Sequence, residues 1–202
     1  MEISANLVRE LREKTGAGVM DCKKALAEAS NDLEKAIVWL REKGIAQAAT
    51  RSGRLASEGS IGAYIHAGGK LGVLIEVNCE SDFVAKTPEF QTLVKELAMQ
   101  VAAANPRCIH REELPTAVIE QERQIYTSQS EGKPPQVVTK IVEGKLEKFY
   151  REVCLLEQSW VRDPNRTISD LIGEYVGKLG EKIDVRRFER FQLGESLDGA
   201  AA

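Results

Sequence analysis

The sequence predicts an α+β protein, in which a small N-terminal bundle of three helices precedes an antiparallel three-stranded sheet packed with helices and a helical hairpin. Three observations support this prediction. Apolar residues recur at intervals of three and four in residues 1–44, they alternate strictly in 71–79, and helical spacing returns from residue 88 onward. Because strands come early and late with helices between them, the helices are expected to pack on one side of the sheet.

Three short helices are expected in residues 1–44. Ser4 can cap the first helix, and the glycines of "TGAG" at 15–18 can end it. A second helix is expected from about Val19 to Ala29, and a third is expected to end at Gly44. Three helices of this length make a bundle with a thin core.

A β-hairpin is expected after a linker. Residues 45–60 are small, polar and basic, which predicts a helical or flexible connection out of the bundle. The first arm of the hairpin is expected at 61–67, the turn at "GG" 68–69, and the second arm at 71–79. In the second arm every other residue is apolar, so those five side chains are expected on one face of the sheet.

The rest of the chain is predicted to be mainly helical, with one late strand. In order, the pattern predicts a helix from Pro88 that stops before Asn105, a helix from Pro115 to about Gln129, a helix through Val137 to about Phe149, a loop at 160–167, a helix from Thr167 to Gly180, and a final strand of imperfect alternation within 182–195. The second and third of these helices flank the turn "EGKPP", which suggests an antiparallel helical hairpin.

The predicted elements divide the chain into four parts. These are a three-helix domain at 1–44, a linker at 45–60, an α+β core at 61–195, and a tail at 196–202 that is expected to be disordered.

Composition indicates a globular protein without a surface for nucleic acid or membrane. Of the 202 residues, 43% are hydrophobic and 29% are charged, and the net charge is −3. No cationic field therefore favours direct binding of nucleic acid, and no apolar run is long enough to span a membrane. The N-terminus lacks the features of a signal peptide, and the four cysteines form no CxxC pair. Free thiols and a cytoplasmic location are therefore expected.

The sequence contains no constellation typical of an enzyme, a metal site or a cofactor site, and none of these is expected. Of the two histidines, His66 stands alone, and Cys108 and His110 lie two residues apart without a second ligand pair at zinc spacing. "GGK" at 68–70 lacks the other residues of a phosphate-binding loop. Cys22 is followed by two lysines, which would lower the pKa of its thiol. It also lies on the apolar stripe of its helix, and core packing is the favoured interpretation.

Residues 78–87, "NCESDFVAKT", raise the main question about function. Polar residues end a strand here, and the aromatic Phe83 follows them directly. In one interpretation Ser81 or Asp82 caps a helical turn while Phe83 folds back onto the sheet. In the other, Phe83 projects from the corner with Asp82 beside it, as aromatic anchors do at protein interfaces. Spacing alone leaves both interpretations open.

A second set of candidates lies at the start of the second helix. Val19 and Met20 follow the tight turn "TGAG", and a methionine at such a corner is either a core plug or an adaptable contact. Lys23 belongs to "CKK", which is either a basic contact for a partner or a solvated helix face.

Three blocks of the sequence resemble the translation elongation factor Ts family. They are "LVRELREKTGAGVMDCKKALAEASNDLEKAIVWLREKG", "LIEVNCESDFVAK" and "EGKPPQVVTKIVEGKLEKFYREVCLLEQSWV", and the resemblance extends over about residues 3–195. The first block is similar to the family's ubiquitin-associated-like domain. The family motif Thr-Asp-Phe stands here as Ser81-Asp82-Phe83, which keeps the hydroxyl. The chain resembles short members, of the bacterial, cyanobacterial or organellar type, that lack the duplicated half-core of longer ones.

The resemblance implies a guanine nucleotide exchange factor that binds elongation factor Tu, both with GDP and without nucleotide. It implies that Phe83 wedges into an apolar pocket of that GTPase, that Asp82 disturbs its magnesium site, and that Ser81 holds the corner in shape. The contacts implied for the N-terminal bundle with the same GTPase domain are Val19, Met20 and Lys23. Because short members can compensate by dimerising, a homodimer is a further expectation.

Two alternatives remain open at this point. The chain could be a ubiquitin-associated interaction module fused to an unrelated α+β domain, which would bind ubiquitin-like folds. It could also be a hydrolase with Cys79 or Cys154 as nucleophile, although no general base is identifiable beside either residue.

Overall fold

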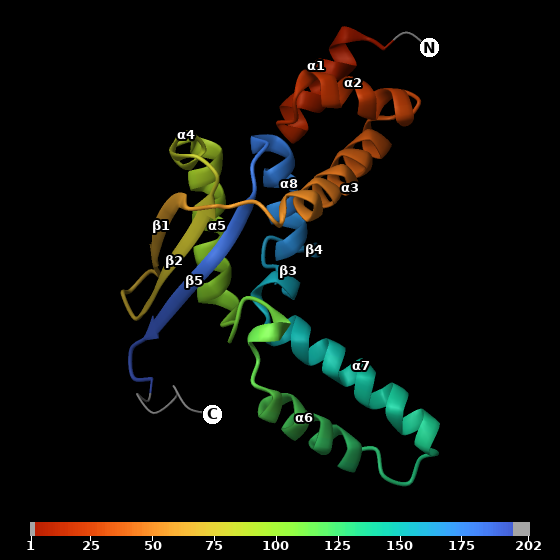
Figure 1. The fold of residues 1–202 in the computed structure, drawn as a ribbon, viewed down its shortest axis with the longest axis vertical. Helices are drawn as coiled ribbons and strands as arrows, with labels where there is room; N and C mark the ends of the chain where they lie inside the picture. Colours follow the sequence, from red (N-terminus) through yellow and green to blue (C-terminus); the bar gives the residue numbers. More distant parts are fainter. Residues whose placement is uncertain (1–2, 196–202) are drawn as a thin grey trace. The chain divides into compact units, whose positions relative to one another are not determined.

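The computed structural model describes residues 3–195, which form two compact units (Figure 1). Within this range, the first unit comprises 3–62, 75–96 and 169–186, and the second comprises 63–74, 97–168 and 187–195. The predicted α+β class is confirmed, with an antiparallel sheet in the order β1-β2-β5 and a separate small sheet of β3 and β4.

In chain order, the elements are α1 Ala5–Thr15, α2 Val19–Glu28, α3 Leu33–Arg51, β1 Glu58–Ile65, β2 Leu71–Cys79, α4 Asp82–Ala85, α5 Pro88–Ala104, the 3₁₀ turn η1 Arg111–Glu113, α6 Thr116–Ser128, α7 Pro135–Val153, the 3₁₀ turn η2 Leu155–Glu157, β3 Ser159–Trp160, β4 Asp163–Thr167, α8 Ile168–Leu179 and β5 Ile183–Gln192.

Helices α1 to α3 form the predicted N-terminal bundle of the first unit. The hydroxyl of Ser4 accepts a hydrogen bond from the backbone N–H of Asn6 (3.3 Å) and so caps α1, and Gly16 at φ +67° ends it. The carboxylate of Asp32 caps α3 in the same way, through the N–H of Lys35 (3.0 Å). The core between the helices is small and consists of Val8, Leu11, Ala17, Cys22, Ala25, Leu26, Ala29 and Ala36.

The prediction that the third helix ends at Gly44 is wrong, because α3 continues to Arg51. Gly44 lies against α8, where a Cβ would come within 2.7 Å of the carbonyl oxygen of Gly173. The guanidinium of Arg41 also pairs with the carboxylate of Asp170 at 2.7 Å. Gly44 therefore permits the close approach of two helices and is not a helix end. The first seven residues of the predicted linker, 45–51, form about the last two turns of this packed helix (Figure 1).

The sheet begins with a hairpin whose turn is as predicted, since Gly68 and Gly69 both have positive φ values. The first arm is shifted relative to the prediction, and β1 spans Glu58–Ile65. On β2 the alternation is confirmed, with a half-buried Leu71 followed by the buried residues Val73, Ile75, Val77 and Cys79.

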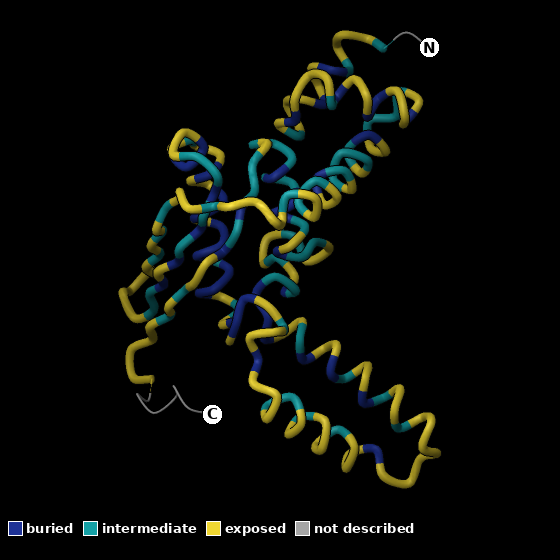
Figure 2. The backbone as a smooth tube through the Cα atoms, in the orientation of Figure 1, coloured by how far each residue is buried: buried dark blue, intermediate teal, exposed yellow. Residues whose placement is uncertain are grey.

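Helix α5 packs closely on the sheet within the first unit. A Cβ on Gly62 of β1 would come within 2.2 Å of a side-chain methyl of Val94, so the glycine makes room for the helix. The hydroxyl of Thr87 accepts a hydrogen bond from the N–H of Phe90 (3.2 Å), which confirms the predicted helix start. The side chain of Phe90 is fully buried, and α5 is buried along much of its length (Figure 2).

In the second unit, α6 and α7 form the predicted antiparallel hairpin (Figure 1). Helix α7 extends to Val153, four residues beyond the predicted end, while α6 has no fully buried residue (Figure 2). Arg111 holds the base of the hairpin, since its guanidinium pairs with Glu147 (2.7 Å) and Glu157 and lies 4.4 Å from the ring centre of Tyr150. At the far end of the hairpin, residues 127–137 are exposed except for the buried Ser130.

The predicted loop at 160–167 is wrong in part, because it contains a second sheet. Strands β3 and β4 pair antiparallel, with Ser159 opposite Thr167 and Trp160 opposite Asp163. These strands are too short and too polar to produce an alternating pattern in the sequence. Helix α8 is confirmed, with Gly180 in a left-handed conformation at its end, and β5 is confirmed with the expected irregular alternation. The predicted tail at 196–202 lies outside the described residues.

Candidate partner-binding site

The corner after β2 is a single capped helical turn. Ser81 is extended (φ −132°, ψ 147°), and its hydroxyl oxygen accepts a hydrogen bond from the backbone N–H of Val84 at 3.3 Å. This is the geometry of an N-cap. The prediction that a residue of this stretch caps a turn is confirmed, and the residue is Ser81 and not Asp82.

Phe83 is displayed on this turn. Its side chain is 81% exposed, whereas the next two residues, Val84 and Ala85, are buried at 6% and 4%. The turn is thus anchored by its second half while Phe83 points into solvent. The interpretation in which Phe83 folds back onto the sheet is wrong.

Asp82 already has a partner within the chain. The ammonium group of Lys86 lies 2.6 Å from its carboxylate, one helical turn further on, and the side chain of Asp82 is 62% exposed. This ion pair raises the pKa of Lys86. The spacing Asp-x-x-x-Lys is a known helical pairing pattern, so the sequence did contain the signal for this contact.

The carboxylate of Glu181, from the turn between α8 and β5, holds the corner from outside. It accepts hydrogen bonds from the backbone N–H of Glu80 (3.1 Å), the backbone N–H of Ser81 (3.0 Å) and the hydroxyl of Ser81 (2.5 Å). Sequence reasoning missed this residue. Because Glu181 lies 100 residues beyond Ser81, no local pattern could have indicated it.

The first turn of α2 carries the second group of predicted contact residues. Met20 is 65% exposed and Val19 is 43% exposed, so neither is a core plug. The side chain of Lys23 is exposed and forms no ion pair with any described residue, whereas the neighbouring Asp21 pairs with Lys43. These side chains are therefore accessible. No hydrogen bond or ion pair joins this group to the corner within residues 3–195.

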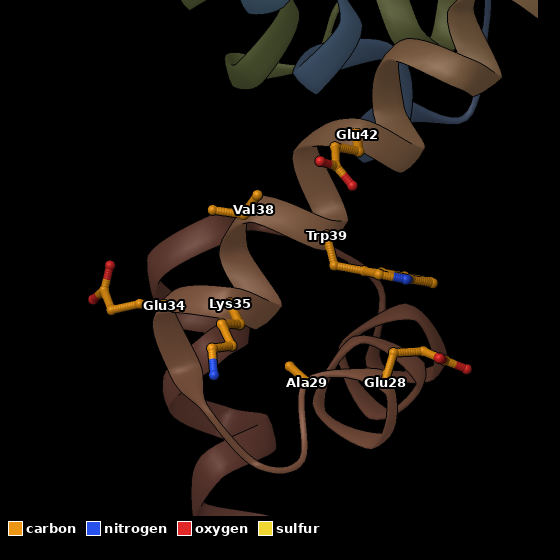
Figure 3. Close-up of a pocket in the computed structure, with 7 residues that line it drawn as sticks. All are labelled: Glu28, Ala29, Glu34, Lys35, Val38, Trp39 and Glu42. Carbon is orange, nitrogen blue, oxygen red and sulfur yellow. The ribbon is translucent and has the colours of Figure 1, made fainter.

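A groove on the same bundle is a separate feature. It has a volume of about 390 Å³ and lies between the end of α2 and the first half of α3. Figure 3 shows Trp39 extending from α3 toward the end of α2, where Glu28 and Ala29 lie. The groove includes none of the predicted contact residues, so it does not enlarge the candidate site.

The cysteines have the surroundings of core residues. All four are buried free thiols, and burial raises the pKa of each of them, to about 12 for Cys154. The lysines beside Cys22 do not outweigh this desolvation, so the expectation of a lowered pKa there is wrong. A thiol whose pKa is raised is a poor nucleophile, which argues against a hydrolase that uses Cys79 or Cys154.

The described residues offer neither a metal-binding cluster nor a membrane-spanning helix. Among residues 3–195, no group of three or more His, Cys, Asp or Glu side chains is arranged to hold a metal ion. In the same part of the chain, no helix combines the length and the apolar character needed to cross a bilayer.

The fold and the corner define the class of the molecule, namely an α+β protein with an N-terminal helical bundle that displays a phenylalanine on a capped, braced turn. Residues 3–195 match a protein family described as "Elongation factor TS". The chain is 61% identical to the protein named Elongation factor Ts from Thermoanaerobacter sp. (strain X514), over 97% of each chain. It is 59% identical to the protein of the same name from Moorella thermoacetica, over 96% of this chain and 97% of the relative. The protein named Elongation factor Ts from Geobacter sulfurreducens is 52% identical, over 98% of this chain and 93% of the relative. The chain belongs to the elongation factor Ts family, whose members are translation elongation factors.

Proposed function

We propose that the chain is a guanine nucleotide exchange factor that binds elongation factor Tu and accelerates the release of GDP. The observation that carries this proposal is the 81% exposure of Phe83 on a turn whose other residues are fixed. Because the backbone of the turn is held in place by its cap and its buried residues, an exposed aromatic side chain on it can bury most of its surface in a partner with little loss of backbone entropy. Membership of the elongation factor Ts family supports elongation factor Tu as that partner.

In the proposed mechanism, the corner disturbs the nucleotide site of the partner. Phe83 enters an apolar pocket of the GTPase domain, and Asp82 perturbs the surroundings of the magnesium ion. The nucleotide then loses metal and phosphate contacts and dissociates. Ser81 keeps the corner in shape, because its hydroxyl caps the turn that carries both side chains.

One phenylalanine cannot supply a large effect alone. Burial of its side chain contributes about 1.5–3 kcal/mol, which corresponds to roughly one to two decades of affinity. Coupling is reciprocal, so the factor by which the chain weakens nucleotide binding equals the factor by which nucleotide weakens binding of the chain. A larger total effect requires a second contact. The exposed side chains of Val19, Met20 and Lys23 are the proposed contribution of the N-terminal bundle.

The direct test is the rate of GDP release from elongation factor Tu with and without the chain. A concentration-dependent acceleration is the expected result, and an unchanged rate would refute the proposal. The alternative of a ubiquitin-associated module predicts binding to ubiquitin instead. A pull-down with ubiquitin and with elongation factor Tu distinguishes the two hypotheses, because an exchange factor should retain elongation factor Tu alone.

We also propose that the chain forms a homodimer and acts in the cytoplasm, where elongation factors encounter their partners. The observation that supports association is a set of exposed apolar side chains beside a hollow on the sheet in the second unit, consisting of Ile65, Leu74, Phe191 and Leu193. Apolar patches of this kind often mark interaction surfaces. Light scattering on the purified protein tests this, since a monomer mass at micromolar concentration would contradict it.

A further inference from the structure

We infer that Glu181 is a positioning residue for exchange, which acts by holding the corner that carries Asp82 and Phe83 in its displayed conformation. This inference rests on the proposed function. Glu181 lies in the three-residue turn between α8 and β5, and its carboxylate accepts hydrogen bonds from the backbone and the cap of the corner. It would therefore influence the partner through the geometry of the residues that follow Ser81.

Glu181 holds the backbone of the corner at the point where β2 ends. Strand β2 ends at Cys79, so the N–H groups of Glu80 and Ser81 lie beyond its regular pairing. One oxygen of the Glu181 carboxylate accepts both of them, at 3.1 and 3.0 Å. Hydrogen bonds to an ionised acceptor are about twice as strong as neutral ones. The carboxylate thereby fixes the direction in which the chain leaves the strand.

Glu181 also orients the Ser81 hydroxyl that caps the turn. The other oxygen of the Glu181 carboxylate accepts the hydroxyl proton of Ser81 at 2.5 Å, while the hydroxyl oxygen accepts the N–H of Val84 at 3.3 Å. Because an ionised carboxylate can only accept hydrogen bonds, it fixes the hydroxyl as its donor and leaves a lone pair free for the cap. An amide in place of the carboxylate could donate to that hydroxyl and compete with the cap.

The turn that carries Glu181 is itself held by the corner, so the bracing is reciprocal. The carboxylate of Glu80 accepts the backbone N–H of Lys182 at 2.6 Å and the guanidinium of Arg54 at 3.2 Å. These contacts hold the pKa of Glu80 below its usual range, with the Lys182 N–H as the largest cause. The ammonium of Lys182 in turn donates to the carbonyl oxygen of Arg54 at 3.1 Å. Each turn thus binds the backbone of the other through a carboxylate, so the corner is held from two directions.

A purely structural role for Glu181 makes a different prediction from a positioning role. If Glu181 only stabilised the fold, its loss would lower the fraction of folded protein and would act independently of Phe83. If it positions the corner, its loss should matter much less once Phe83 is removed, because only Asp82 then remains to be positioned. A double-mutant comparison separates the two, because effects that act through one another are not additive.

The experiment uses the full chain with Glu181→Gln, and Glu189→Gln on the exposed part of β5 as the matched control. Three quantities are measured: the maximal rate of GDP release from elongation factor Tu, the concentration of the chain at half of that rate, and hydrogen exchange at the Glu80 and Ser81 amides without the partner. The same substitution is also made in a Phe83→Ala background. If Glu181→Gln fails to fold, Ser81→Ala is the second variant, since it removes one of the three contacts and the cap.

Glu181→Gln is expected to lower the maximal rate about tenfold, the equivalent of one hydrogen bond to a charged group. The half-maximal concentration should stay within about twofold, and the two amides should exchange faster. In the Phe83→Ala background the further loss of rate should be clearly smaller than in wild type, because only Asp82 remains to be positioned. Glu189→Gln should match wild type. An undiminished rate, unchanged amide protection, or an additive loss beside Phe83→Ala would overturn the inference. If wild type itself fails to accelerate release, the proposed function falls and this inference falls with it, so the two failures are distinguishable.

Discussion

Truncation of Phe83 to alanine should separate exchange activity from stability. The side chain is 81% exposed and anchors nothing within the fold, since the buried residues of its turn are Val84 and Ala85. Replacement of an exposed residue of this kind changes the free energy of unfolding by no more than about 0.5 kcal/mol. The variant is therefore expected to fold as wild type does.

The effect on the partner can be scaled from the exposed surface. Full burial of a phenylalanine side chain contributes about 1.5–3 kcal/mol. Since Phe83 has 81% of its surface still to bury, the available contribution is about 1.2–2.4 kcal/mol. At 1.4 kcal/mol per decade, this corresponds to a roughly 7-fold to 50-fold slower release of GDP.

The assay measures the release of a fluorescent GDP analogue from elongation factor Tu over a range of concentrations of the chain, with thermal unfolding of the free variant measured in parallel. Phe90→Ala is the control, because Phe90 is fully buried and its truncation should cost about 3–5 kcal/mol of stability. A Phe83→Ala variant that releases GDP as fast as wild type would refute the wedge role. A variant that unfolds as easily as Phe90→Ala would refute the reasoning from exposure.

Three further predictions follow from other parts of the structure. Gly44→Ala should destabilise the fold by about 1–3 kcal/mol, because the new Cβ would meet the backbone of α8. Gly144→Ala should instead stabilise the fold by up to about 1 kcal/mol, because Gly144 lies in open space on α7. Chemical denaturation of both variants measures these two changes in the free energy of unfolding. The folded-state pKa of Glu80 lies below its ordinary value of 4.5, so its contribution is complete above that pH and is lost as the pH falls through the folded pKa. Stability should thus decline as the pH falls below 4.5, and less so in Glu80→Gln. Lys86→Ala frees Asp82 from an exposed ion pair and should change GDP release by less than about twofold, and a larger loss would mean that Lys86 itself contacts the partner.

Local chemistry in the sequence was sufficient for most of the fold. Ser4, Thr87 and Ser81 cap helices because a hydroxyl followed by free backbone N–H groups needs no distant partner. The alternation of β2 and the helical hairpin were predictable for the same reason, since their patterns lie within a few residues. The end of α3 was not predictable from the sequence. A glycine that ends a helix and a glycine that lets a second helix pack closely look alike until the position of the second helix is known.

The candidate site was likewise predictable from the sequence only in part. The sequence by itself pointed to the corner around Ser81, Asp82 and Phe83 and offered a capped turn as one of two interpretations, and the family resemblance favoured a displayed Phe83. The local sequence pattern left open whether Phe83 was buried or exposed, because one turn of helix can direct a side chain toward the sheet or toward solvent. Only the tertiary structure decided this, by burying Val84 and Ala85 and bracing the corner with Glu181 from a turn 100 residues away. A side chain's exposure and its distant partners depend on what the rest of the chain packs beside it, which no local pattern records.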